Sequence, residues 1–181
     1  MNIYEYIHIE NSYYEDNGME TSTKTSVGEG LYENAWTYKG TAFTSEHIGD
    51  FFGYVYRITN LQTGKQYIGR KYFTQRRKPR GGKRRVTSES DWKKYYGSSP
   101  ELKQDVKEFG RNTFRREIIS LHATPGKVNY EETRQLFLNN VLTEALDNGE
   151  PAFYNSNVLG RYFRKDYFNG LSDGKDSARD D

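Results

Sequence analysis

The stretch GYVYRITN-LQTGK-QYIGRK, residues 53–71, decides the fold that the sequence predicts. Two runs rich in β-branched and aromatic residues flank a short polar segment that ends in Thr-Gly and Lys65. This pattern is typical of a β-hairpin. Because successive side chains of a strand point to opposite faces, Tyr54, Tyr56 and Ile58 share one face of the first strand. We therefore expect a hairpin with one aromatic face.

Three further elements are predicted downstream of the hairpin. Residues 99–101, Ser-Pro-Glu, are typical of a helix start, and Gly110 ends that helix. Residues 113–121 have the composition of a third strand, and Thr124-Pro125-Gly126 breaks it. Residues 130–146 carry the apolar spacing of a second helix. The predicted fold class is α+β, with a three-stranded antiparallel sheet flanked by helices.

The chain of 181 residues is long enough to bury one sizeable core. We expect residues 51–168 to form that domain, residues 1–50 to be an acidic N-terminal extension that packs on it in part, and residues 169–181 to be a disordered tail. The absence of cysteine excludes disulfides, zinc–thiolate sites and thiol nucleophiles. No window approaches the roughly 18 consecutive apolar residues that a membrane span needs, so no membrane partner is expected.

Charge is distributed very unevenly along the chain, although the net charge is only +2. Residues 1–50 hold nine acidic and two basic side chains, whereas residues 65–88 hold ten basic side chains and no acidic one. Such a run attracts a polyanion and releases its counterions. The alternative is a solvated basic loop. The run follows the hairpin directly, so we interpret these residues as nucleic-acid-binding: Lys65, Arg70, Lys71, Arg76, Lys78, Arg80, Lys83, Arg84 and Arg85.

The order hairpin, helix, strand, helix, with a tyrosine motif on each hairpin strand, resembles the GIY-YIG nuclease family over roughly residues 52–155. Tyr54-Val55-Tyr56 stands where that family has Gly-Ile-Tyr, and Tyr67-Ile68-Gly69 is its second motif unaltered. The two motif tyrosines, Tyr56 and Tyr67, are eleven residues apart, which suits a hairpin that brings both phenols to one site. The alternative for each tyrosine is cross-strand aromatic packing.

The resemblance implies three more site residues. The family's arginine, expected on the first helix, corresponds to Arg77, with Arg76 as the fallback; an arginine suits this role because its fork donates two hydrogen bonds to phosphate oxygens. The metal ligand corresponds to Glu131, with Glu132 as the fallback, and the ion would be Mg²⁺ or Mn²⁺. The alternative for both glutamates is an acidic helix N-terminus stabilised by the helix dipole. Asn155 matches an asparagine after the last core helix, and its alternative is a turn residue.

The implied activity is that of a metal-dependent endonuclease that hydrolyses DNA phosphodiesters. In this mechanism Tyr56 takes the proton of the attacking water, which requires a phenol pKa well below about 10, and nearby cations such as Lys65, Arg70 or Lys71 would lower it. Tyr67 orients the water or the phosphate by hydrogen bonding. The rival hypothesis is a noncatalytic nucleic-acid-binding module that keeps the fold and the basic loop.

Two stretches, residues 92–99 and 154–164, resemble small phage-encoded endonucleases of this family, including homing-type ones. This resemblance implies DNA as the partner, with RNA as an alternative, and a cytoplasmic location in a bacterial or phage-infected cell. Cutting both strands with one site per chain would imply a homodimer on DNA. The chain departs from the family at Tyr54, which replaces the first glycine, and at Gly81-Gly82, where several relatives carry a histidine. We therefore expect the helix after Arg77 to be short, broken or replaced by a loop.

Overall fold

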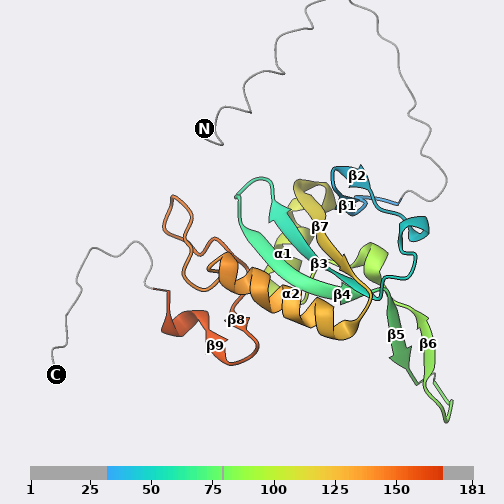
Figure 1. Cartoon of the computed structure of the whole chain (residues 1–181). Helices are drawn as coiled ribbons and strands as arrows, with labels where there is room; N and C mark the ends of the chain where they lie inside the picture. Colours follow the sequence, from blue (N-terminus) through green and yellow to red (C-terminus); the bar gives the residue numbers. More distant parts are fainter. Residues whose placement is uncertain (1–31, 79, 169–181) are drawn as a thin grey trace, which may run out of the picture.

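The structure is a computed structural model, and it describes residues 32–78 and 80–168 (Figure 1). Its centre is a five-stranded sheet with the order β2-β1-β7-β3-β4. The three predicted strands are present, with β3 antiparallel to β4 on one side and to β7 on the other, but the sheet is wider than predicted because β1 joins it parallel to β7. The prediction of a three-stranded sheet was therefore wrong in strand number. The sheet strands are β1 (Thr37–Tyr38), β2 (Thr41–Ala42), β3 (Gly53–Asn60), β4 (Gln66–Tyr72) and β7 (Phe114–His122).

Two α-helices complete an α+β fold, which agrees with the predicted class. Helix α2 lies across one face of the sheet (Figure 1). No helix in the part of the chain that the structure describes has the length and apolarity that crossing a bilayer requires. The remaining elements are α1 (Pro100–Phe109), α2 (Pro125–Leu138), β5 (Thr74–Arg77), β6 (Val86–Glu89), β8 (Asn157–Val158), β9 (Tyr162–Phe163), and the 3₁₀ turns η2 (Ser45–His47), η3 (Trp92–Lys94), η4 (Arg111–Thr113) and η5 (Arg164–Asp166).

The alternation of side chains along β3 sends its residues into two separate apolar layers. Tyr54, Tyr56 and Ile58 face a layer that includes two buried tryptophans and α1. Val55 faces the opposite layer, which is closed by Val128 and other side chains of α2. Burial on both faces explains why Tyr54, Val55 and Tyr56 form an unbroken apolar and aromatic run in β3. It also fixes which side chains of the neighbouring β4 point toward α2.

The segment before β3 belongs to the folded unit. Trp36 and Phe43 are 0% and 2% exposed, and the indole N–H of Trp36 donates to the carbonyl oxygen of Trp92 over 2.8 Å. The strand pair β1–β2 extends the sheet. Residues 32–50 therefore pack on the domain, as expected for part of the segment, and the packed structure continues across the boundary predicted at residue 50. The remainder of the expected extension, residues 1–31, and the expected tail, residues 169–181, lie outside the described residues.

The ends of the two helices show one confirmed and one wrong prediction. Ser99 caps α1 as predicted, because its hydroxyl accepts from the backbone N–H of Leu102 over 3.3 Å, and Gly110 follows the helix with a φ of +84°. The strand ends before Thr124-Pro125-Gly126, as predicted, but the same segment begins α2 with Thr124 as the capping residue, so the helix predicted from residue 130 starts at Pro125. Proline is favoured at this position because its missing N–H is not needed there. The two candidate glutamates consequently lie inside α2 and not at its N-terminus.

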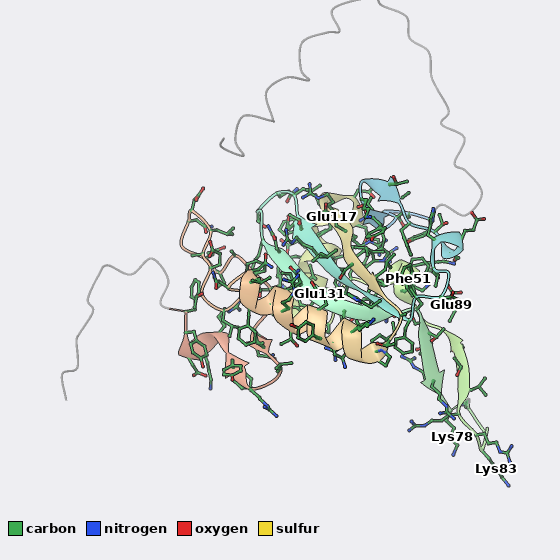
Figure 2. All side chains as sticks on the ribbon, viewed as in Figure 1. Phe51, Lys78, Lys83, Glu89, Glu117 and Glu131 are labelled. Carbon is green, nitrogen blue, oxygen red and sulfur yellow. The ribbon has the colours of Figure 1, made fainter. Side chains whose placement is uncertain are left out.

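The later part of the basic run, from residue 74 on, forms a hairpin that projects from the domain (Figures 1 and 2). Strands β5 and β6 pair with each other and with no strand of the main sheet. We call residues 74–78 and 80–89 the basic arm. Residues 74–78 and 80–89 contain no helix, which agrees with the expectation that the helix after Arg77 is short, broken or replaced by a loop; Arg77 is the last residue of β5.

Candidate active site

A cavity of about 520 Å³ lies beside β4, the edge strand of the sheet, and we call it the Tyr67 pocket. Tyr67 and Arg70 reach it from β4, Glu132 reaches it from α2, and Asn155 from the segment before β8. Ser98, in the turn before α1, also lines it. Because Tyr67 and Arg70 point to opposite faces of β4, they can only meet around the outer edge of that strand. The pocket therefore depends on β4 being an edge strand.

Glu132, and not Glu131, is the glutamate of the Tyr67 pocket. Its side chain is 13% exposed, and its carboxylate is paired with the guanidinium of Arg70. Burial raises the pKa of Glu132 above its ordinary value, while the charge and hydrogen bonds of Arg70 act in the opposite direction. Neither partner has a second counterion within 4.0 Å among the described residues. The pocket thus holds one carboxylate and one guanidinium in mutual contact.

Glu131 points away from the pocket and is occupied elsewhere on α2. Its carboxylate accepts hydrogen bonds from Arg134 Nε over 3.0 Å and from Gln135 Nε2 over 2.8 Å. The hydrogen bond from Arg134 lowers the pKa of Glu131 most strongly. Adjacent residues of an α-helix are separated by about 100°, so only one of the two glutamates can face β4. The metal-ligand role stays a prediction, but the geometry transfers it to the fallback residue.

Two glycines make room for the ring of Tyr67, whose hydroxyl shares a 2.8 Å hydrogen bond with Ser98 Oγ. A Cβ at Gly69 would lie 2.6 Å from the hydroxyl oxygen of Tyr56 and 2.8 Å from Cε1 of Tyr67. A Cβ at Gly97 would lie 2.9 Å from the same Cε1, and Gly97 has a φ of +78°. The glycine of the second tyrosine motif is therefore required by the close approach of the two tyrosine rings.

Tyr56 lies behind the ring of Tyr67 and does not line the Tyr67 pocket. It is 1% exposed, and its ring centroid is 5.0 Å from that of Trp36 and 6.1 Å from that of Tyr67. Burial is the largest of the effects that raise the pKa of Tyr56 well above its ordinary value, and the neighbouring phenols of Tyr67 and Tyr95 add to it. The expectation of a lowered phenol pKa was wrong. Tyr56 keeps its proton at neutral pH.

The cations that were expected to lower this pKa have other partners. Lys65 is 9% exposed and is paired with Glu101, so it is not a surface group available to nucleic acid. Arg70 is paired with Glu132 in the Tyr67 pocket. Lys71 Nζ contacts Asp91 Oδ1 over 2.5 Å and lies 3.8 Å from the centroid of the Tyr95 ring.

The side-chain amide of Asn155 is hydrogen-bonded to the backbone of β4. Its Nδ2 donates to the carbonyl oxygen of Ile68 over 2.8 Å, and its Oδ1 accepts from the N–H of Ile68 over 3.0 Å. The side-chain amide thus pairs with the strand edge as a peptide group would. Next to it, the N–H of Tyr154 donates to the carbonyl oxygen of Gln66 over 2.7 Å. Asn155 holds the chain segment after α2 against β4.

Arg77 and Arg76 do not line the Tyr67 pocket. Both line a second cavity of about 630 Å³ at the base of the basic arm, together with Lys71 and Arg70. Arg70 borders both cavities. Among the described residues it is the one arginine in the lining of the Tyr67 pocket, whereas the sequence assigned it to nucleic-acid binding and to lowering the pKa of Tyr56. The sequence position of Arg70, directly after the second tyrosine motif, is the feature from which its place at the pocket could have been predicted.

The family model described as "Putative endonuclease segE, GIY-YIG domain" matches residues 36–158, which is more than half of the chain. The chain belongs to the GIY-YIG nuclease family. The matched span begins at Trp36, in agreement with the folded unit and not with a boundary at residue 51. No curated protein and no solved structure matches the chain. GIY-YIG membership implies a nuclease domain and a nucleic acid as its substrate.

The GIY-YIG site offers a hard, oxygen-rich donor set for a metal ion. Glu132 is the single carboxylate in the described lining of the Tyr67 pocket, and the hydroxyls of Tyr67 and Ser98 border the same space. No group of three or more His, Cys, Asp or Glu side chains occurs within residues 32–78 and 80–168. One carboxylate, supplemented by water and phosphate oxygens, is how proteins commonly hold Mg²⁺. The residues present fit Mg²⁺ or Mn²⁺ bound in this way.

The buried phenols give a prediction for alkaline pH. Burial raises the pKa of Tyr54 and Tyr56 in the folded chain, so the neutral phenols stabilise the fold below about pH 10 and this stabilisation is lost as pH rises through the folded-state pKa. We expect the phenolate absorbance of Tyr56, isolated as the difference between wild type and Tyr56→Phe, to appear only together with loss of the near-ultraviolet circular dichroism of the folded protein. Ionisation of Tyr56 in the folded protein near pH 7 to 8 would contradict the burial of its hydroxyl.

Proposed function

We propose that this GIY-YIG domain hydrolyses DNA phosphodiester bonds in the Tyr67 pocket, with one divalent metal ion, Mg²⁺ or Mn²⁺, as the cofactor. The observation that carries the proposal is the convergence of Tyr67, Arg70 and Glu132, from a strand and a helix, in one cavity of about 520 Å³. Membership of the family supplies the reaction class. The cavity supplies a place for a phosphate that is open to the surface and bordered by groups of both charges.

The Arg70–Glu132 ion pair suits a site that receives a phosphate and a cation together. In the structure the two side chains neutralise each other. With substrate bound, Arg70 would turn from the carboxylate to nonbridging phosphate oxygens, and Glu132 would then be free to hold the metal ion. Each group keeps a partner of the opposite charge, so neither is left unpaired in the half-buried site. The bound ion would neutralise charge that develops on the leaving oxygen.

The hydroxyl groups of the pocket position the attacking water. Tyr67 has its hydroxyl hydrogen-bonded to Ser98 Oγ over 2.8 Å at the pocket wall, where it can orient a water molecule. Tyr56 packs behind Tyr67 and burial raises its pKa, so in this arrangement we assign the proton of the attacking water to a solvent molecule in the open pocket and not to Tyr56. Arg77 is assigned to substrate binding at the base of the basic arm.

A plasmid-nicking assay tests the proposed function. We expect the wild-type protein with Mg²⁺ or Mn²⁺ to convert supercoiled plasmid to nicked or linear DNA, and chelation of the metal with EDTA to stop the conversion. Binding of the plasmid is measured on the same samples by electrophoretic mobility shift in EDTA. If the protein binds DNA but cuts no DNA or RNA form with either ion, the noncatalytic binding module is the correct interpretation.

A further inference from the structure

The basic arm is a narrow ribbon whose cations have no carboxylate partner among the described residues. Its strands pair from Thr74 opposite Glu89 to Arg77 opposite Val86. None of its seven cations has a carboxylate within 4.0 Å in the part of the chain that the structure describes, and all seven are exposed. Figure 2 shows Lys78 and Lys83 near its tip, far from the main sheet. The seven cations are Arg76, Arg77, Lys78, Arg80, Lys83, Arg84 and Arg85.

The dimensions and side chains of the arm favour duplex DNA over a single strand. Two paired strands lie about 4.8 Å apart, and the major groove of B-DNA, about 12 Å wide, accommodates a two-stranded ribbon. Proteins that bind single strands use aromatic side chains on which bases stack, and residues 74–89 contain no aromatic residue. Instead the arm carries Gln75, Thr87 and Ser88, which can form hydrogen bonds with base edges or phosphates.

Positively charged side chains connect the base of the basic arm with the Tyr67 pocket. The cavity of about 630 Å³ at the arm's base has four cations and no carboxylate in its lining. One of these cations, Arg70, also borders the Tyr67 pocket. A DNA backbone that follows the cationic lining from the arm is therefore led past Arg70 toward Tyr67.

We propose that the basic arm lies in the major groove of duplex DNA and anchors the duplex next to the Tyr67 pocket. The position of the pocket relative to the scissile bond rests on the proposed function, but groove binding by the arm does not. The arm's cations contact the phosphates on both sides of the groove, and this contact sets where along the duplex the pocket meets the backbone.

The test compares DNA binding by two variants of the full chain that lose the same charge. The arm variant is Lys83→Gln/Arg84→Gln/Arg85→Gln. The matched control is Lys107→Gln/Arg111→Gln/Arg115→Gln, which removes three exposed cations from the end of α1, η4 and the start of β7. Binding to fluorescent duplex and to single-stranded DNA of equal length is measured by anisotropy in EDTA, at several salt concentrations. Circular dichroism melting establishes that both variants are folded.

We expect the arm variant to bind duplex DNA at least tenfold more weakly than wild type. We also expect its slope of log K against log salt to be smaller by about 3, because each lost phosphate contact removes about one released counterion. The control should change duplex affinity less than threefold, and the arm variant should change single-strand affinity less than threefold. Equal losses in the arm variant and the control, or equal losses on duplex and single strand, would overturn groove binding. Since EDTA prevents cleavage, arm-dependent duplex binding by a protein that never cuts would defeat the proposed function alone.

Discussion

Glu132→Gln is expected to lower the rate of plasmid cleavage at least about a hundredfold, whereas Glu131→Gln should leave the rate within about threefold of wild type. The glutamine keeps the size of the side chain but removes the charge that holds the metal ion, and losing one group that stabilises transition-state charge typically costs about 10² to 10³ in rate. Glu131 is engaged by Arg134 and Gln135 outside the pocket. The measurement is the initial nicking rate with saturating Mg²⁺.

A second readout separates metal binding from positioning of Arg70. Binding of Mn²⁺ to the protein, followed by calorimetry without DNA, should be lost in Glu132→Gln and retained in Glu131→Gln. Both variants should bind duplex DNA in EDTA, since neither removes a cation. A protein that loses cleavage and Mn²⁺ binding through Glu131→Gln instead would restore the assignment made from the sequence and would require α2 to face β4 differently.

Trp36→Ala is expected to lower the free energy of unfolding by about 3–5 kcal/mol, the usual cost of truncating a fully buried large aromatic side chain. Trp36 is 0% exposed, packs edge-on against Tyr54 and Tyr56, and donates its indole N–H to Trp92. Removing it therefore leaves a cavity beside the motif tyrosine and takes one of two hydrogen bonds from the carbonyl oxygen of Trp92. The free energy of unfolding is measured by chemical denaturation. Unfolding is monitored by far-ultraviolet circular dichroism, a signal that does not depend on the tryptophan that is removed.

The matched control for this prediction is Tyr130→Ala on α2. Tyr130 is 71% exposed, so its truncation should change the free energy of unfolding by less than about 0.5 kcal/mol. If Trp36→Ala were as mild as this control, residues 32–50 would be an extension that packs only loosely on the domain. That result would support the boundary expected from the sequence.

Local chemistry made the hairpin and the first helix predictable. Alternation of apolar and aromatic residues defined β3 and β4, and the Ser99-Pro100 start and Gly110 end defined α1. The start of α2 also carried a local signal, since threonine followed by proline is a common helix start. Interpreting the same residues as a strand break placed the helix too late. Family resemblance then supplied Tyr67 and a choice between two glutamates.

The rest depended on contacts between residues far apart in the sequence. Strand β1 is two residues long and joins β7 across some eighty positions, so it has no periodicity of its own. The arm strands lack an apolar face because nothing covers them, and the usual strand pattern is therefore missing. The choice between Glu131 and Glu132 required the rotation of α2 about its axis, and the pKa of Tyr56 required the depth of its burial. None of these features can be predicted from a short stretch of sequence.

The amide of Asn155 makes the Tyr67 pocket sensitive to chemical ageing. Its nitrogen and oxygen each have one partner on Ile68, so the position demands a donor and an acceptor on the same planar group. Hydrolysis of that amide to aspartate would preserve its shape but set a negatively charged oxygen against a carbonyl oxygen. Deamidation at this single atom would thus loosen a wall of the pocket without touching any group that meets the substrate.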